Sequence, residues 1–164
     1  MKGYVLAIAL LFALAPRAEA LDTPKGAVIL TVEGKLSHSN SGDKALFDLA
    51  MLDALPGRTV TLDTPWTKKA ATYSGPLLRA VLDAAGAGRG AVTIRALNDY
   101  SAVIPPEDVT GLNIILATRM DGETMPVRDK GPMMVIYPFD EDSSLYTETY
   151  FARSVWQIKS LEVR

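Results

Sequence analysis

Apolar and polar residues follow one another in short runs along most of the chain, a pattern typical of strands more than of long helices. The run at 27–32 is rich in β-branched residues and ends at Glu33-Gly34, so we expect a strand there. Asp121-Gly122 suits a two-residue hairpin turn, which predicts that the strands on either side of it pair. The other predicted strands are 59–62, 92–97, 101–104, 112–120, 124–127, 133–137 and 155–163.

Helical spacing is clearest at 76–85, where the apolar residues recur on one face. Pro76 suits the first position of that helix, and Gly86 suits the position after its end. A shorter helix is expected after Asp48, whose carboxylate suits an N-cap, and Pro56-Gly57 should end it. Short helices among several strands, without strict alternation, predict an α+β fold with a mixed β-sheet. The sequence contains no internal repeat, so we expect a single domain.

Residues 1–20 have the pattern of a targeting signal. They begin with Lys2, continue with an apolar run as far as Ala15, and end in the small-residue triplet Ala18-Glu19-Ala20. The apolar run is well short of the ~20 residues that a membrane-spanning helix needs, and no later segment is long and apolar enough either. We therefore expect residues 1–20 to be a cleaved signal peptide, residues 21–164 to form the domain, and the mature protein to be periplasmic or secreted.

Composition narrows the chemistry that this domain can perform. The chain has 164 residues, of which 17 are Lys or Arg and 19 are Asp or Glu, so no overall positive charge is available to bind nucleic acid. It has no cysteine, which excludes disulfides, thiolate nucleophiles and cysteine-ligated zinc or iron–sulfur sites. Its one histidine, His38, lies in a polar loop without a G-x-S-x-G motif elsewhere, so we expect neither a serine hydrolase nor a zinc enzyme.

Polar residues at the ends of predicted strands are the remaining candidates for a binding site. Asn98-Asp99-Tyr100 lies between two strands, Arg128-Asp129-Lys130 precedes another, and Arg153 and Trp156 stand near the start of the last. The same residues suit ordinary roles, namely turns for Asn and Asp, an ion pair for Arg and core packing for Trp. Taken alone, the patterns favour these ordinary roles, because turns are commoner than sites.

Several segments have an order and spacing that point further. They are 73–82, Asp99-Tyr100 with Ile104-Pro105, Ile115-Leu116-Ala117 with Met120-Asp121-Gly122, Arg128-Asp129-Lys130-Gly131-Pro132, Tyr137-Pro138, and 155–163. Together they resemble the oxidoreductase molybdopterin-binding domain of sulfite-oxidase-type enzymes, above all its short, exported, stand-alone versions. The resemblance extends from Gly26 to Val163. It implies a compact mixed α+β fold and, in full-length family enzymes, a pterin-bound molybdenum centre that carries out oxo transfer.

The sequence departs from the family pattern where the cofactor is held. In family enzymes a cysteine after a V-T-L strand ligates molybdenum, whereas here that strand leads to Asp63 and Thr64, which have no sulfur. The family motif R-D-H-G-F-P with a following Arg becomes the segment 128–132, with Met134 near the position of that Arg, and Trp156 replaces a basic residue. A neutral hydroxyl cannot replace a soft thiolate, and each lost cation weakens phosphate binding by about 1.5–3 kcal/mol.

The leading hypothesis is therefore an exported domain of this fold that is degenerate at the metal position and acts as a small-ligand or anion binding or sensing module. Arg128, Lys130 and Arg153 would hold the anion. The alternative is a molybdenum- or tungsten-pterin-dependent oxidoreductase, with molybdopterin as cofactor and the metal held by the pterin dithiolene alone or by Asp63 or Thr64.

A third hypothesis is a structural partner of another exported protein, which a large exposed patch around Trp156, Tyr146, Tyr150 and Phe151 would favour. The candidate cofactor- or ligand-binding residues are Asp63, Thr64, Trp66, Asn98, Asp99, Tyr100, Arg128, Lys130 and Arg153.

Overall fold

The structure, a computed structural model, describes residues 20–164 of the chain. The predicted signal peptide lies outside the described residues except for Ala20, so it stays a prediction. Within residues 20–164 no helix combines the length and the apolar character needed to cross a membrane.

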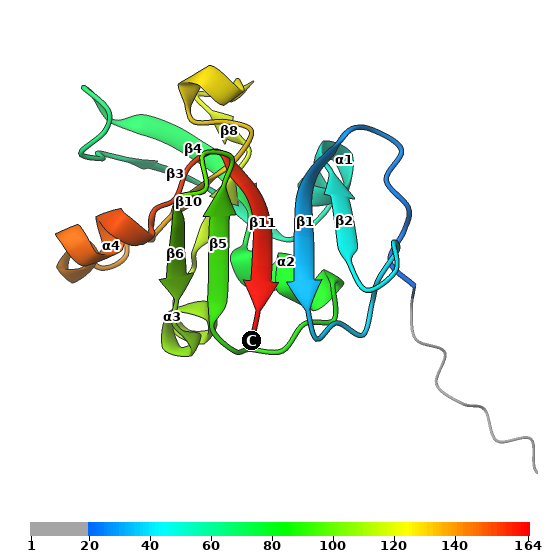
Figure 1. Cartoon of the computed structure of the whole chain (residues 1–164). Helices are drawn as coiled ribbons and strands as arrows, with labels where there is room; N and C mark the ends of the chain where they lie inside the picture. Colours follow the sequence, from blue (N-terminus) through cyan, green and yellow to red (C-terminus); the bar gives the residue numbers. More distant parts are fainter. Residues whose placement is uncertain (1–19) are drawn as a thin grey trace, which may run out of the picture.

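A mixed five-stranded sheet forms the larger part of the molecule (Figure 1). Its strands are β1 (Val28–Gly34), β2 (Ala45–Asp48), β5 (Val92–Ala96), β6 (Ser101–Ile104) and β11 (Ile158–Val163). Their order is β2-β1-β11-β5-β6; β1 and β11 are parallel, and the other neighbouring pairs are antiparallel. The last strand of the chain therefore lies at the centre of the sheet, and the predicted mixed α+β fold in a single domain is confirmed.

A second sheet contains the V-T-L strand, and the segment with the metal position of the family pattern follows that strand. Its strands are β3 (Gly57–Leu62), β4 (Ala71–Pro76), β8 (Arg119–Met120) and β9 (Glu123–Thr124), in the order β3-β4-β8-β9, and a short separate pair joins β7 (Ile115–Ala117) to β10 (Met134–Ile136). The β3–β4 hairpin projects from the body of the molecule on the left of Figure 1. The turn at 63–70 lies at the end of this hairpin, on the same side of the molecule as the last helix.

The helices are short. They are α1 (Leu49–Asp53), α2 (Leu78–Ala84), α3 (Pro106–Gly111) and α4 (Glu148–Arg153), with 3-10 turns η1 (Val127–Asp129) and η2 (Ser143–Leu145). The predicted cap of α1 is confirmed, because the Asp48 carboxylate accepts a hydrogen bond of 2.9 Å from the Met51 backbone N–H. The same carboxylate accepts from the N–H groups of Lys25 and Gly26, so it also fixes the entry into β1.

The helix predicted at 76–85 begins later, at Leu78, because Pro76 is the last residue of β4 and pairs with Gly57. Its end is as predicted: Gly86 follows with a φ of +61°, in the left-handed region that favours glycine. The apolar face of α2 is buried in the core formed by both sheets.

The predicted strand at 112–120 is two strands instead of one. Its middle is bent because β7 pairs with β10 while β8 pairs with β4, so the segment passes from one sheet to another. The hairpin at Asp121-Gly122 joins β8 and β9 as predicted, whereas 127–129 forms η1 instead of continuing the strand. Strands β2 and β4 and helices α3 and α4 were not predicted.

Candidate functional site

At the position that the family resemblance assigns to a metal ligand, two hydroxyl groups are hydrogen-bonded to each other. The Thr64 side chain is buried, and its Oγ1 lies 2.7 Å from Oγ1 of Thr67 in a hydrogen bond. The Thr67 backbone N–H donates to the Thr64 carbonyl, so the turn is also held by the main chain. Asp63 beside it is exposed. This position therefore offers a hydroxyl already engaged in a hydrogen bond, and it has no anionic sulfur for a soft metal.

A pocket of about 390 Å³ lies beside this turn. Trp66 reaches it from the turn after β3, Asn98 and Tyr100 from the β5–β6 turn, and the rest of the wall comes from α4 and the segment that links it to β11. The structure thus brings together Trp66, Asn98 and Tyr100, which the sequence placed in one candidate site. The lining residues are Trp66, Ala96, Asn98, Tyr100, Glu148, Phe151, Ala152, Ser154, Val155 and Trp156.

Aromatic rings form much of the pocket wall. The Trp66 ring lies 6.1 Å from that of Phe151, at an interplanar angle of 89°, and 6.2 Å from that of Trp156, at 56°. Such inclined contacts suit the quadrupoles of aromatic rings. The indole N–H of Trp66 is buried and has no hydrogen-bond partner among the described residues. A buried donor of this kind is normally satisfied, so the Trp66 N–H is an exception among the described residues.

The basic residues of the predicted anion site do not converge. Arg153 donates from Nη1 to Oδ2 of Asp108 at 2.9 Å, and Arg128 has a side chain that is 86% exposed, with its Nε 3.3 Å from the carboxylate of Asp129. Lys130 alone lies next to the pocket, with Nζ 6.0 Å from the centre of the Trp156 ring. The anion would therefore meet one of the three basic side chains at this pocket.

Arg153 belongs to a buried polar group that holds α4. The Tyr137 hydroxyl also donates to Oδ2 of Asp108 at 2.9 Å, and the Arg153 guanidinium lies over the Tyr150 ring. Burial, together with the neighbouring Asp108 charge, raises the pKa of Tyr137 well above its ordinary value, so the hydroxyl remains a donor. A second contact also holds α4, because the Tyr100 hydroxyl donates a hydrogen bond of 2.8 Å to the Ala152 carbonyl. Both contacts hold the C-terminal end of α4, at Ala152 and Arg153.

Asp99 lies next to the pocket without lining it. Its backbone has a φ of +65°, and its carboxylate accepts a hydrogen bond of 2.7 Å from Lys159. This hydrogen bond, with the charge of Lys159, lowers the pKa of Asp99. Asn98 accepts from the Tyr100 backbone N–H through its side-chain oxygen, as expected of a turn residue.

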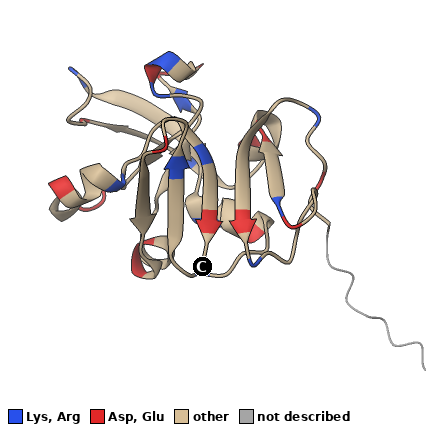
Figure 2. Cartoon of the chain, viewed as in Figure 1, with Lys and Arg blue, Asp and Glu red and all other residues tan. Residues whose placement is uncertain are grey.

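Only Trp66, Asn98 and Tyr100 of the lining residues were predicted as site residues. The polar and aromatic lining residues outside that prediction are Glu148, Ser154, Phe151 and Trp156, of which Trp156 was named from the sequence as the replacement of a basic residue and as part of an exposed aromatic patch. Helix α4 has an acidic residue, Glu148, in its first turn and a basic one, Arg153, in its last, and Figure 2 shows both colours on this part of the chain. The only sequence signal for this wall was the density of aromatic residues between 146 and 156. Within residues 20–164 no cluster of His, Cys, Asp and Glu side chains is suited to hold a metal ion.

A second hollow, of about 540 Å³, lies between α1 and the β3–β4 sheet and includes Arg58 and Arg119 in its wall. Arg119 forms a two-pronged ion pair with Asp53, with N–O distances of 2.6 and 2.7 Å. Arg58 contacts Asp140 at 2.6 Å and Glu141 at 3.0 Å. Both cations are thus neutralised within the chain, which leaves this hollow without a free charge for an anion.

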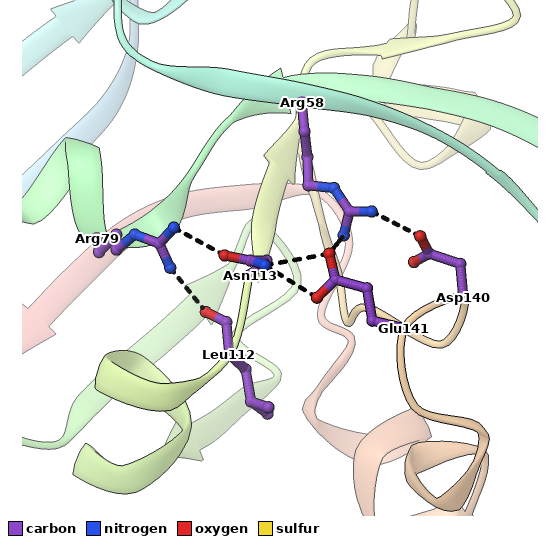
Figure 3. A network of polar contacts seen from close by, with 6 residues as sticks. All are labelled: Arg58, Arg79, Leu112, Asn113, Asp140 and Glu141. Carbon is purple, nitrogen blue, oxygen red and sulfur yellow. Dashed lines mark hydrogen bonds and ion pairs between the residues drawn. The ribbon is translucent and has the colours of Figure 1, made fainter.

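The Arg58 ion pairs continue into a network that anchors the segment before α4 (Figure 3). The Asn113 side-chain amide donates to the Glu141 carboxylate at 2.9 and 3.1 Å, and Arg79 donates to the Asn113 oxygen at 2.7 Å. The network therefore ties β3, α2 and the start of β7 to the loop at 140–141.

Comparison with known proteins agrees with this fold. A family model described as "Oxidoreductase molybdopterin binding domain" matches residues 45–163. Among solved structures, the sulfane dehydrogenase SoxCD from Paracoccus pantotrophus is similar, with a TM-score of 0.61 and 18% sequence identity over 88% of this chain. The matched part is 40% of that SoxCD chain, so this chain spans well under half of its length. No curated protein matches this chain.

Proposed function

Because the chain belongs to the oxidoreductase molybdopterin-binding domain family, we propose that it is an exported member whose metal position is degenerate and whose pocket binds a small organic ligand. The observation that carries this proposal is the burial and the hydrogen bonding of the Thr64 hydroxyl. A buried hydroxyl, hydrogen-bonded to Thr67, stands where the family resemblance calls for a thiolate. The whole chain has no cysteine that could take its place.

The pocket is a poor match for a phosphorylated metal-pterin cofactor. Its only charged lining side chain is the carboxylate of Glu148, which would repel a phosphate. Arg153 is held by Asp108 and Arg128 extends into solvent, so of the three predicted cations only Lys130 lies near the pocket, outside its lining, whereas tight phosphate binding uses several charge-assisted hydrogen bonds. The residues present therefore do not fit the cofactor, and we derive no redox step through it.

The same pocket is well suited to an organic molecule without a phosphate. Its volume of about 390 Å³ lies within the range of small-molecule sites, about 300–1,000 Å³. Its walls are rich in aromatic rings, namely those of Trp66, Tyr100, Phe151 and Trp156. Because α4 contributes both Glu148 and Phe151 to the wall, a ligand in the pocket would contact α4 directly. The protein would act as a sensor if a partner protein bound the exposed aromatic residues around α4, of which Tyr146 is 45% exposed.

The second candidate is a molybdenum- or tungsten-pterin oxidoreductase, and the family match over residues 45–163 is the observation that favours it. Metal analysis of the protein purified from cells supplied with molybdate and tungstate separates the two functions. We expect far less than one metal ion per chain and no fluorescence from oxidised pterin. Stoichiometric metal together with pterin would establish the second candidate instead.

Ligand binding can be followed without labels, because the chain has two tryptophans and both line the pocket. A small molecule that enters the pocket should change the tryptophan emission, and a screen of organic compounds would find it. Cell fractionation and N-terminal sequencing of the mature protein test export. An intact N-terminus in the cytoplasmic fraction would contradict it.

A further inference from the structure

The charge of the pocket wall indicates what kind of ligand it takes. Glu148, at the start of α4, is the one charged side chain in the lining, and its carboxylate has no ion-pair or hydrogen-bond partner among the described residues. Two basic side chains of the surrounding segments are already paired, Arg153 with Asp108 and Lys159 with Asp99, whereas Lys130 beside Trp156 has no ion pair among the described residues. A ligand inside the pocket therefore meets one unpaired carboxylate in the lining, on the exposed residue Glu148, and one ammonium group outside the lining, that of Lys130 beside Trp156.

The aromatic walls favour a positively charged ligand. Trp66, Phe151 and Trp156 present rings at inclined angles around a common space, and Tyr100 adds a fourth ring to the lining. The faces of aromatic rings carry negative partial charge and attract cations, most strongly for tryptophan. The ammonium group of Lys130 lies over the Trp156 ring, 6.0 Å from its centre, at the outer limit of a cation–π contact.

We propose that the pocket binds an organic cation of the alkylated ammonium class, with the charged head among the aromatic rings and near Glu148. This inference rests on the proposed function, because it names the ligand class of the same pocket. A strongly hydrated ion such as sodium would gain little there, since the walls offer few oxygen ligands. An alkylated ammonium group has an apolar surface that the rings can cover and a charge that Glu148 can balance.

Lys130 makes the sign of the ligand testable. Its ammonium group would repel a cationic ligand and attract an anionic one, whereas the Glu148 carboxylate does the reverse. Removing each charge in turn should therefore change the affinity for the ligand in opposite directions. A cationic ligand should bind more weakly without the Glu148 charge and more tightly without the Lys130 charge, and an anionic ligand should show the reverse.

The experiment uses choline and its uncharged isostere 3,3-dimethyl-1-butanol, titrated into the full-length mature protein and followed by tryptophan emission and calorimetry. The two probes have nearly the same shape, so their difference isolates the charge. We expect choline to bind about tenfold or more tightly than the isostere, as one well-placed cation–π contact with a neighbouring carboxylate allows.

The variants sharpen this test. Glu148→Gln should weaken choline binding by about two- to fivefold and leave the isostere unchanged, in keeping with a partly exposed charge pair. Lys130→Gln should strengthen choline binding by a similar factor. Glu123→Gln is the matched control, since it removes an exposed carboxylate that does not line the pocket. Melting temperatures of each variant show that the fold is kept, and Trp156→Phe, at a position 40% exposed, provides a further folded variant with a weakened cation site.

Two outcomes overturn the inference, and they have different consequences. If the isostere binds as tightly as choline, or if benzoate binds and Lys130→Gln weakens it, the pocket is a ligand site of another class and the proposed function stands. If choline leaves the emission and the calorimetric signal unchanged, the inference is wrong; if the screen of organic compounds, with the isostere, benzoate and a metal-free pterin among them, also finds no binder, the proposed function is wrong as well.

Discussion

Replacing Asp108 with Asn removes the charge that joins α3 to α4 while it keeps the size of the side chain. Asp108 is 6% exposed, and its Oδ2 accepts hydrogen bonds of 2.9 Å from both the Tyr137 hydroxyl and Arg153. A hydrogen bond to a charged group contributes about 1.5–3 kcal/mol, and breaking a fully buried ion pair costs about 3–5 kcal/mol. The Arg153 side chain is 27% exposed, so water partly solvates it once the pair is broken. We therefore expect Asp108→Asn to lower the free energy of unfolding by about 2–3 kcal/mol.

Urea unfolding followed by far-UV circular dichroism measures this loss from the midpoint and the slope of the transition. Glu107→Gln is the matched control, because it neutralises the exposed neighbouring acid in the same helix and should change stability by less than about 0.5 kcal/mol. Tyr137→Phe combined with Asp108→Asn should cost less than the sum of the two single changes, since both remove one shared contact. An Asp108→Asn protein as stable as the Glu107→Gln control would refute the reasoning.

Three other changes test features of the fold. Gly86→Ala adds a Cβ that overlaps the neighbouring loop at a φ of +61°, so we expect a loss of about 1–3 kcal/mol in urea unfolding, whereas Gly88→Ala, with nothing within 4 Å, should be nearly neutral; equal losses would contradict this. Arg58→Gln breaks two partly exposed ion pairs and should cost about 0.5–2 kcal/mol, less in high salt; a loss independent of salt would argue against an electrostatic origin. Hydrogen bonds from backbone N–H groups, that of Met51 first, hold the pKa of Asp48 below its ordinary value. The stability that they provide is present above the unfolded-state pKa of about 3.9 and is lost as the pH falls through the lower folded-state pKa. Asp48→Asn should therefore lower the urea midpoint at neutral pH and much less near the acid end of the transition, and equal effects at both would contradict the assignment.

The sequence was most informative where a residue type has few conformational uses. The cap at Asp48, the hairpin at Asp121-Gly122 and the glycine after α2 were predicted correctly, because each of these residues satisfies a local backbone requirement. Strand β4 was missed for the opposite reason. Its Tyr73-Ser74-Gly75 core has no β-branched run, and its pairing with β3 makes it a strand.

The candidate site depended on contacts between distant segments, which local patterns do not report. The family resemblance indicated the importance of Thr64 and brought Trp66 into the same candidate site. It did not show that Arg153 would turn to Asp108, 45 residues away along the chain, because this pairing exists only once α3 and α4 pack. Three of the predicted residues, Trp66, Asn98 and Tyr100, therefore lie in the wall of one pocket, and the sequence did not reveal the charge of that wall.

The central place of β11 has a consequence for the order in which the molecule assembles. Because β11 separates β1 from β5, the five-stranded sheet cannot close until residues 158–163 have been synthesised. Pairing of the first strand with the last is a contact of long sequence separation, and such contacts slow folding. Until then β1 and β5 each present an open edge, which is prone to pair with other chains. A chain that ends before β11 is therefore expected to aggregate as two sheet fragments, and a fusion partner belongs after Arg164, where it leaves this strand intact.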